Sequence, residues 1–276
     1  GTVRGVHELT VQTLTVQDGV RIGVRSGGLL NGVGRVTGLA LGVALPALAL
    51  DLTQMTDNER ASFRAEVRAY LMDNPQVIME AVALLEERQA KAQANADMSL
   101  VTDNASDIFD DGYSYVGGNL NGDITLVEFI DYRCGYCKRA HDEVAKLMQA
   151  DGNIRLIVKE FPILGEQSVL ASQFAVAAKQ IAGPKAYKAI GDALMTQNGT
   201  ITLRSLRSIA SSFGMDANAI EAHMKSDDVR REIAQTRALA QRLKISGTPT
   251  FVLQDELLRG YLPFNEMLAL VNEKRG

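Results

Sequence analysis

Two cysteines, Cys134 and Cys137, constrain this 276-residue chain more than any other feature, because the sequence contains no third one. A framework of several disulfide bridges and a zinc site made of four cysteines are therefore both excluded. A disulfide across so short a loop restricts the unfolded chain very little, since the entropic gain grows with loop length. The pair is thus poorly explained as a stabilising bridge, and a chemical role is the better hypothesis.

The position of the pair in the chain favours such a role. Cys134 follows a predicted strand at 124–130 and opens a helical pattern that leads to a second predicted strand at 154–161. It is therefore expected at the N-terminal end of a helix, where partial positive charge and free backbone N–H groups lower the pKa of a thiol. Cys137 lies one turn further on, within reach of a mixed disulfide at Cys134. This context predicts thiol–disulfide exchange, with Cys134 as nucleophile and Cys137 as resolving thiol.

Metal binding is the main alternative for the pair. Zinc would need further ligands, and the chain has only three histidines, His7, His141 and His223. We predict no metal site and no cofactor. Cu(I) suits two soft thiolates, so a copper-binding protein stays open as an alternative function. A chance pair of inert thiols is the remaining alternative.

The rest of the main domain, assigned to residues 113–276, shows a recognisable order of elements. Five helical patterns follow the second strand, at 166–181, 184–195, 203–213, 217–224 and 227–243. Two short strands, at 250–253 and 257–261, and a last helix at 263–274 complete the chain. A strand-helix-strand half and a strand-strand-helix half with helices inserted between them predict an α/β, thioredoxin-like fold.

Two further helices are predicted upstream, in a module and linker assigned to residues 50–100. Thr56 and Glu59 form a capping box, and Asn74 followed by Pro75 places a cap residue before a proline at the first helical position. Each helix carries one narrow apolar stripe that it cannot bury alone. Docking on the main domain would cover the stripes, and so would pairing between copies of the chain. We expect a homo-oligomer formed through residues 56–96.

The first 49 residues are predicted to be a secretory signal with a mis-assigned or added start. Residues 36–49 are apolar and uncharged, follow several arginines and end in Ala-Leu-Ala. This run is shorter than the roughly 20 residues that span a bilayer, which favours a cleaved signal over an anchor. The formal charge of -4 gives no broad basic surface, so no nucleic-acid partner is expected.

Residues 127–138 (VEFIDYRCGYCK) and 247–251 (GTPTF) resemble the DsbA-like thioredoxin superfamily of bacterial disulfide enzymes. The resemblance implies that Pro249 is cis and faces the cysteines, and that the backbone of Thr248 pairs with a bound substrate strand. It also implies a buried acid at Glu128, which accepts the proton of Cys137 when that thiol attacks. Lys159 is the expected partner of Glu128.

Residues 63–89 resemble the N-terminal module of the ScsC (suppressor of copper sensitivity) group, in which a DsbA-like domain is carried on an oligomerising helical stalk. Gly135 and Tyr136 match DsbC-type isomerases and depart from the Pro-His of the DsbA oxidase. We therefore predict a periplasmic isomerase or reductase that acts on exported proteins with cysteines and needs a membrane redox partner. A monomeric DsbA-like oxidase and a periplasmic Cu(I)-binding protein are the alternatives.

Overall fold

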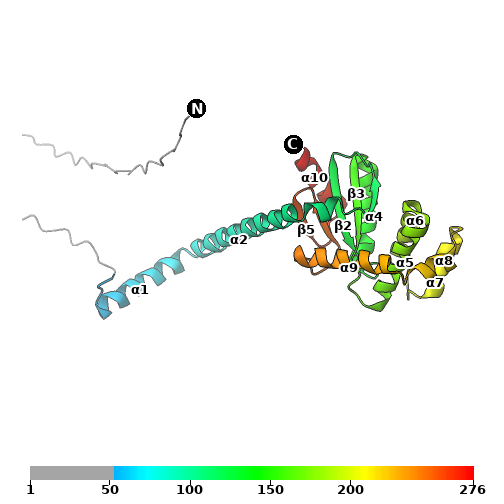
Figure 1. Ribbon diagram of the computed structural model, residues 1–276. Coiled ribbons are helices and arrows are strands. Elements are labelled where there is room, and N and C mark those ends of the chain that lie inside the picture. Colours follow the sequence, from blue (N-terminus) through cyan, green and yellow to red (C-terminus); the bar gives the residue numbers. More distant parts are fainter. Residues whose placement is uncertain (1–52) are drawn as a thin grey trace, which may run out of the picture. The chain divides into compact units, whose positions relative to one another are not determined.

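The computed structural model describes residues 53–276 (Figure 1). The predicted secretory signal at 36–49 lies outside these residues. Contacts group residues 64–276 into one compact unit. Among the helices of the described range, none is both long enough and apolar enough to cross a membrane.

A five-stranded mixed sheet forms the centre of this unit, with the order β1-β3-β2-β4-β5. The strands are β1 (Tyr115–Gly118), β2 (Ile124–Ile130), β3 (Ile154–Glu160), β4 (Thr250–Leu253) and β5 (Glu256–Arg259). β2 and β3 are parallel, and the other three pairings are antiparallel. This topology confirms the predicted α/β, thioredoxin-like fold and adds the unpredicted edge strand β1.

Helices cover both faces of the sheet (Figure 1). On one face, α4 (Gly135–Asp151) and α10 (Phe264–Arg275) pack on the side chains of Ile124 and Leu126. On the other face, α9 (Asp227–Arg242) packs on the side chains of Val127 and Phe129. Side chains alternate along a strand, so the even-numbered residues of β2 point toward α4 and the odd-numbered ones point toward α9.

The predicted helical block lies between β3 and α9. It consists of α5 (Glu166–Ala182), α6 (Pro184–Thr196), α7 (Leu203–Ser212) and α8 (Ala217–His223). Each predicted helix has the expected start, and each end differs from the prediction by one residue. Phe174 and Ile190 of the block share one hydrophobic cluster with Tyr132 and Cys137. The block therefore supports the region of the cysteines directly.

The upstream helices are α1 (Asp57–Asp73) and α2 (Gln76–Asp103). The capping box at α1 is confirmed, because the Thr56 N–H donates to the Glu59 carboxylate and the Glu59 N–H donates to the Thr56 hydroxyl. The predicted side-chain cap at Asn74 is wrong. Its amide group donates to the Tyr70 carbonyl at 2.9 Å and closes the end of α1 instead.

The last turns of α2 and the short helix α3 (Ala105–Phe109) are packed into the core. Val101 and Ile108 are buried in the cluster that covers the α9 face of the sheet. Arg259 on β5 donates two hydrogen bonds to the buried carboxylate of Asp97. The part of the chain that was expected to continue as helix and linker is therefore helical up to Asp103 and fixed to the sheet at its end.

Candidate active site

Both cysteines lie where β2 passes into α4. Cys134 occupies the N-cap position of α4, with an extended backbone at φ -75° and ψ 117°. It is 8% exposed, whereas Cys137 is fully buried within the first turn of the helix. Both thiols are free. The outer sulfur is thus the one that a substrate can reach.

The environment separates the acidities of the two thiols. A hydrogen bond from the Cys137 thiol, together with the N–H groups of Cys137 and Tyr136, lowers the pKa of Cys134 to about 5, although partial burial acts in the opposite direction. The same thiol hydrogen bond and burial raise the pKa of Cys137 far above its ordinary value. At neutral pH the pair therefore consists of an outer thiolate and an inner thiol, as exchange chemistry requires.

The loop before β4 faces the outer cysteine. The Thr248–Pro249 peptide bond is cis. The Sγ atom of Cys134 lies 3.2 Å from the carbonyl oxygen of Thr248. Hydrogen bonds from the Thr250 hydroxyl to the Gly247 carbonyl and from the Gly260 N–H to the Pro249 carbonyl hold this loop in place. The half-buried Thr248 thus lies beside the nucleophile, where an incoming chain would meet it.

A buried carboxylate that the sequence analysis did not single out organises the turn before Cys134. Asp131 accepts one hydrogen bond from the Arg133 N–H at 2.7 Å, and two from the N–H groups of Ile163 and Leu164, at 2.8 Å and 3.0 Å. It thereby ties the cysteine turn to the loop that follows β3. Aspartate side chains commonly accept a hydrogen bond from the backbone N–H two residues further on, so the sequence carries a local signal for the contact with Arg133.

Glu128 is buried on the α4 face of β2, and its Oε1 atom has no hydrogen-bond partner within the described part of the chain. Burial raises the pKa of this carboxyl group to about 7, and the nearby charge of His141 opposes the rise. Glu128 lines a cavity of about 400 Å³ between the sheet, α4 and α6. An unpaired carboxyl group that titrates near neutrality can accept or release a proton there.

The expected pair between Glu128 and Lys159 is wrong. In the parallel register Glu128 lies opposite Val158, so Lys159 shares its face with Phe129 and points away from Glu128. The Lys159 ammonium donates to the Asp111 carboxylate at 2.6 Å and to the Asp107 carbonyl at 2.9 Å. Lys159 therefore fixes the segment before β1 to the far face of the sheet.

A second buried carboxylate, Glu160, follows Lys159 on the α4 side of the sheet. It accepts hydrogen bonds from the hydroxyl groups of Tyr132, Tyr187 and Ser172, at 2.7 Å, 2.6 Å and 2.6 Å. These bonds join β3 and the cysteine turn to α5 and α6. Unlike Glu128, Glu160 has its oxygens paired, which indicates a structural role.

Within residues 53–276, no three His, Cys, Asp or Glu side chains come together in an arrangement that could hold a metal ion. An outer thiolate, an inner thiol and a cis-proline loop on a thioredoxin-like sheet are the arrangement that thiol–disulfide exchange requires.

The chain belongs to the family of DSBA-like thioredoxin domains, whose family model matches residues 125–271. Residues 59–92 match the N-terminal domain of the copper resistance protein ScsC. The predicted resemblance to DsbA-like and ScsC-type proteins is thereby confirmed.

Solved structures agree with this assignment. A thioredoxin-like oxidoreductase from Silicibacter pomeroyi is 40% identical, with a TM-score of 0.58 over 62% of this chain and 96% of that one. Proteus mirabilis ScsC in a transitional conformation is 26% identical, with a TM-score of 0.59 over 80% of this chain and 98% of that one. A periplasmic thioredoxin-like protein from Salmonella enterica is 28% identical, with a TM-score of 0.56 over 62% of this chain and 94% of that one.

The curated relatives are longer proteins. The Na(+)/H(+) antiporter NhaA 3 of Salinispora tropica is 26% identical over 239 residues, which are 85% of this chain and 35% of that protein. The chain spans between 24% and 35% of the length of the curated relatives that it matches.

Proposed function

We propose that this chain is a periplasmic disulfide isomerase or reductase of exported proteins that acts through Cys134 and Cys137. The observation that carries the proposal is the difference in pKa between the two thiols, which is lowered for Cys134 and raised for Cys137. A pKa of about 5 makes Cys134 a thiolate at neutral pH, ready to attack a substrate disulfide. The similarity to a periplasmic thioredoxin-like protein supports the compartment.

The proposed reaction begins when the Cys134 thiolate attacks a substrate disulfide. A bond forms between Cys134 and one substrate sulfur, and the other substrate sulfur leaves as a thiolate. In isomerisation this thiolate attacks a different disulfide of the substrate, and a later exchange displaces Cys134. If the mixed disulfide persists, Cys137 attacks the Cys134 sulfur and releases reduced substrate. The resulting Cys134–Cys137 disulfide is then reduced by a membrane redox partner.

Glu128 is the proposed proton acceptor for the second step. Cys137 stays protonated at neutral pH and must lose its proton before its sulfur can attack. Glu128 projects from β2 toward α4, the helix that carries Cys137, and its Oε1 atom has no hydrogen-bond partner among the described residues. The pKa of its carboxyl group, about 7, allows it to accept a proton at neutral pH. Thr248 and Pro249 are the proposed contact for the substrate backbone.

The helices α1 and α2 are proposed to form a homo-oligomer through residues 56–96. Their apolar stripe, which includes Val67, Ile78, Val82 and Leu85, is exposed to solvent in the single chain. Several apolar side chains in one stripe are typical of a surface that meets a partner. The match of residues 59–92 to the ScsC N-terminal domain supports the same interpretation.

Refolding of ribonuclease with scrambled disulfides tests the proposal. The full chain is compared with Cys134→Ser, with the double substitution Val82→Asp and Leu85→Asp in the stripe, and with the control Lys91→Asp, which lies on the opposite face of the same helix. We expect recovery of ribonuclease activity that needs Cys134 and an intact stripe and that tolerates the control. Sedimentation shows whether the stripe variant has lost its oligomeric state.

An oxidase would behave differently. It would recover no scrambled ribonuclease, and both the full chain and the stripe variant would oxidise a reduced peptide rapidly. That result would replace the isomerase by a monomeric DsbA-like oxidase.

A further inference from the structure

The cavity beside Glu128 extends along the face of α4 that carries the inner cysteine. Its α4 wall includes His141, Val144 and Met148, which follow Cys137 by four, seven and eleven positions. Residues with this spacing lie on one face of a helix, one turn after another. His141 is thus the first cavity residue on α4 below Cys137, and it borders the same cavity as the free carboxyl oxygen of Glu128.

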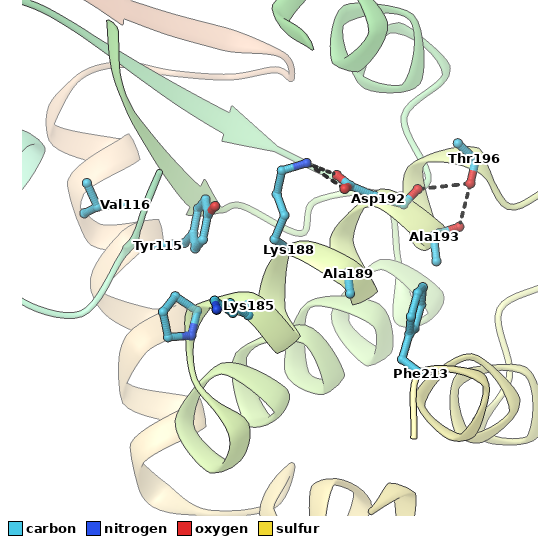
Figure 2. A pocket seen from close by; sticks show the side chains of 10 residues that line it. Tyr115, Val116, Lys185, Lys188, Ala189, Asp192, Ala193, Thr196 and Phe213 are labelled. Atoms are coloured by element: carbon cyan, nitrogen blue, oxygen red, sulfur yellow. Dashed lines mark hydrogen bonds and ion pairs between the residues drawn. The ribbon is translucent and has the colours of Figure 1, made fainter. Parts of the chain in front are cut away.

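A polar contact between α4 and α6 fixes the position of His141. Its Nε2 atom lies 3.3 Å from the Oδ1 atom of Asp192 on α6. Asp192 is itself held by Lys188, whose ammonium donates to both carboxylate oxygens at 2.7 Å and 2.6 Å (Figure 2). Although burial acts to raise it, the hydrogen bonds from His141 and Lys188 keep the pKa of Asp192 below its ordinary value.

Asp192 and Lys188 also line a hollow of about 710 Å³ on the outer side of α6, which Figure 2 shows from close by. The two residues therefore separate this outer hollow from the inner cavity that contains Glu128. The His141 side chain is 27% exposed, so it reaches solvent while Glu128 does not. His141 therefore borders both the cavity of the buried acid and solvent.

The other polar groups that face the inner cavity are three tyrosines, the uncharged amide of Gln149 and the Lys188–Asp192 pair. Tyr132 and Tyr187 donate their hydroxyls to Glu160, and burial raises the pKa of each of them well above its ordinary value. Burial also raises the pKa of Tyr115, so all three stay neutral. Imidazole is the side chain that ordinarily changes its charge between pH 5 and pH 8. Among the described residues that line this cavity, His141 carries the one imidazole.

We propose that His141, oriented by Asp192, is a positioning residue for the resolving step, because its positive charge favours the carboxylate form of Glu128 that accepts the Cys137 proton. The inference rests on the proposed role of Glu128. In the step itself the proton moves from the Cys137 thiol to the Glu128 carboxylate, and the Cys137 sulfur attacks the Cys134 sulfur. The bond from Cys134 to the substrate sulfur breaks, and that sulfur leaves as a thiolate. His141 forms no bond to the reacting atoms.

The test follows the resolving step alone in the full-length protein. Mixing the reduced protein with oxidised glutathione first forms the mixed disulfide at Cys134, and the attack of Cys137 then releases the second glutathione. Rapid acid quenching and mass spectrometry give the rate of this second step from pH 5 to pH 9. Cys134 is covalently bonded at this stage, so its own ionisation does not enter the profile.

We expect the rate to rise with a midpoint near the pKa of Glu128, about 7. Loss of the charge in His141→Gln is expected to move the midpoint up by about one pH unit, because that charge lowers the pKa of Glu128 and opposite charges typically act on this scale. The ionised fraction of Glu128 at pH 7 then falls from about one half to about one eleventh, which is about a fivefold slower step. His141→Arg keeps a positive charge, so its midpoint should stay at or below that of the unaltered protein.

Two comparisons make the outcome decisive. Lys185→Gln removes a positive charge from the outer hollow only and should leave the midpoint unchanged. An unchanged midpoint in His141→Gln, or equal shifts in His141→Gln and His141→Arg, would overturn the inference, since a purely structural His141 does not depend on charge. Glu128→Gln tests the proposed proton acceptor separately from the inference about His141. If it keeps the rate and the profile of the unaltered protein, the proposed proton acceptor itself is wrong.

Discussion

The stability of the reduced protein should depend on pH through Cys134. The pKa of this thiol falls from an ordinary value of 9.0 to about 5 in the folded chain, mainly because the Cys137 thiol donates a hydrogen bond to it. A group with a lower pKa in the folded state contributes its full stability above the unfolded pKa. That contribution is lost as the pH falls through the folded pKa.

The magnitude follows from the distance between the two pKa values. Each pH unit between them changes the free energy of unfolding by about 1.4 kcal/mol, so the interval from pH 5 to pH 7 corresponds to about 2.7 kcal/mol. Solvent next to the sulfur screens part of this interaction, and we therefore expect about 2 kcal/mol. The reduced protein should gain this amount relative to a variant without the titrating thiol.

Urea unfolding under reducing conditions measures the effect in the full chain and in Cys134→Ser, at pH 5 and at pH 7. Buried acids such as Glu128 and Glu160 occur in both proteins, so their contributions cancel in the difference. The absorbance of the thiolate at about 240 nm gives an independent titration, with a midpoint near pH 5 that Cys134→Ser lacks. A difference in unfolding free energy that stays constant between the two pH values, or a midpoint near pH 8, would refute the reasoning.

Three further substitutions test the supports of the site by urea unfolding. Asp131→Ala removes a carboxylate that accepts three backbone hydrogen bonds, so we expect the free energy of unfolding to fall by about 3 kcal/mol and the rate of Cys134 alkylation to change. A fall below about 1 kcal/mol would contradict the role given to Asp131. Lys159→Met leaves the Asp111 carboxylate without its counter-charge at 7% exposure and should cost about 3 to 5 kcal/mol. Adding Asp111→Asn removes the charge but keeps an acceptor for the N–H groups of Tyr113 and Ser114, so it should restore most of the loss; equal losses in the single and double variants would argue against a buried pair. Tyr187→Phe removes one of the hydroxyls that hold Glu160 and should cost about 1 to 2 kcal/mol, and an unchanged midpoint of unfolding would show that this bond contributes nothing.

The sequence was sufficient where local pattern and position decide the structure. The run of apolar and β-branched residues at 124–130 predicted β2 with its observed bounds, and the junction of a strand and a helix placed Cys134 at the start of α4. β1 was missed because its four residues, YVGG, include two glycines, and glycine weakens any strand pattern. Short edge strands depend on their neighbour for stability, and here that neighbour is β3.

Pairings across the fold were beyond the reach of the sequence. Glu128 and Lys159 both lie on central strands, but only the register of β2 against β3 shows that they point to opposite faces. The contact of His141 with Asp192 depends in the same way on how α6 packs against α4. Asp131 had a local signal, yet its bonds to the loop after β3 require the folded sheet.

The attachment of α2 also determines how the catalytic domain would be carried. One continuous helix bears the exposed Val82 and is held to β5 through Asp97, about 22 Å further along at 1.5 Å per residue. The direction of the apolar stripe is therefore related to the direction of the sheet by the number of residues between Val82 and Asp97, because each residue turns the helix by about 100°. A single residue inserted between Val82 and Asp97 would rotate the face presented by Cys134 by about that angle relative to the apolar stripe, and four residues would nearly restore it. In the proposed oligomer, the number of residues between Val82 and Asp97 would thus set the direction in which the active site of each subunit faces.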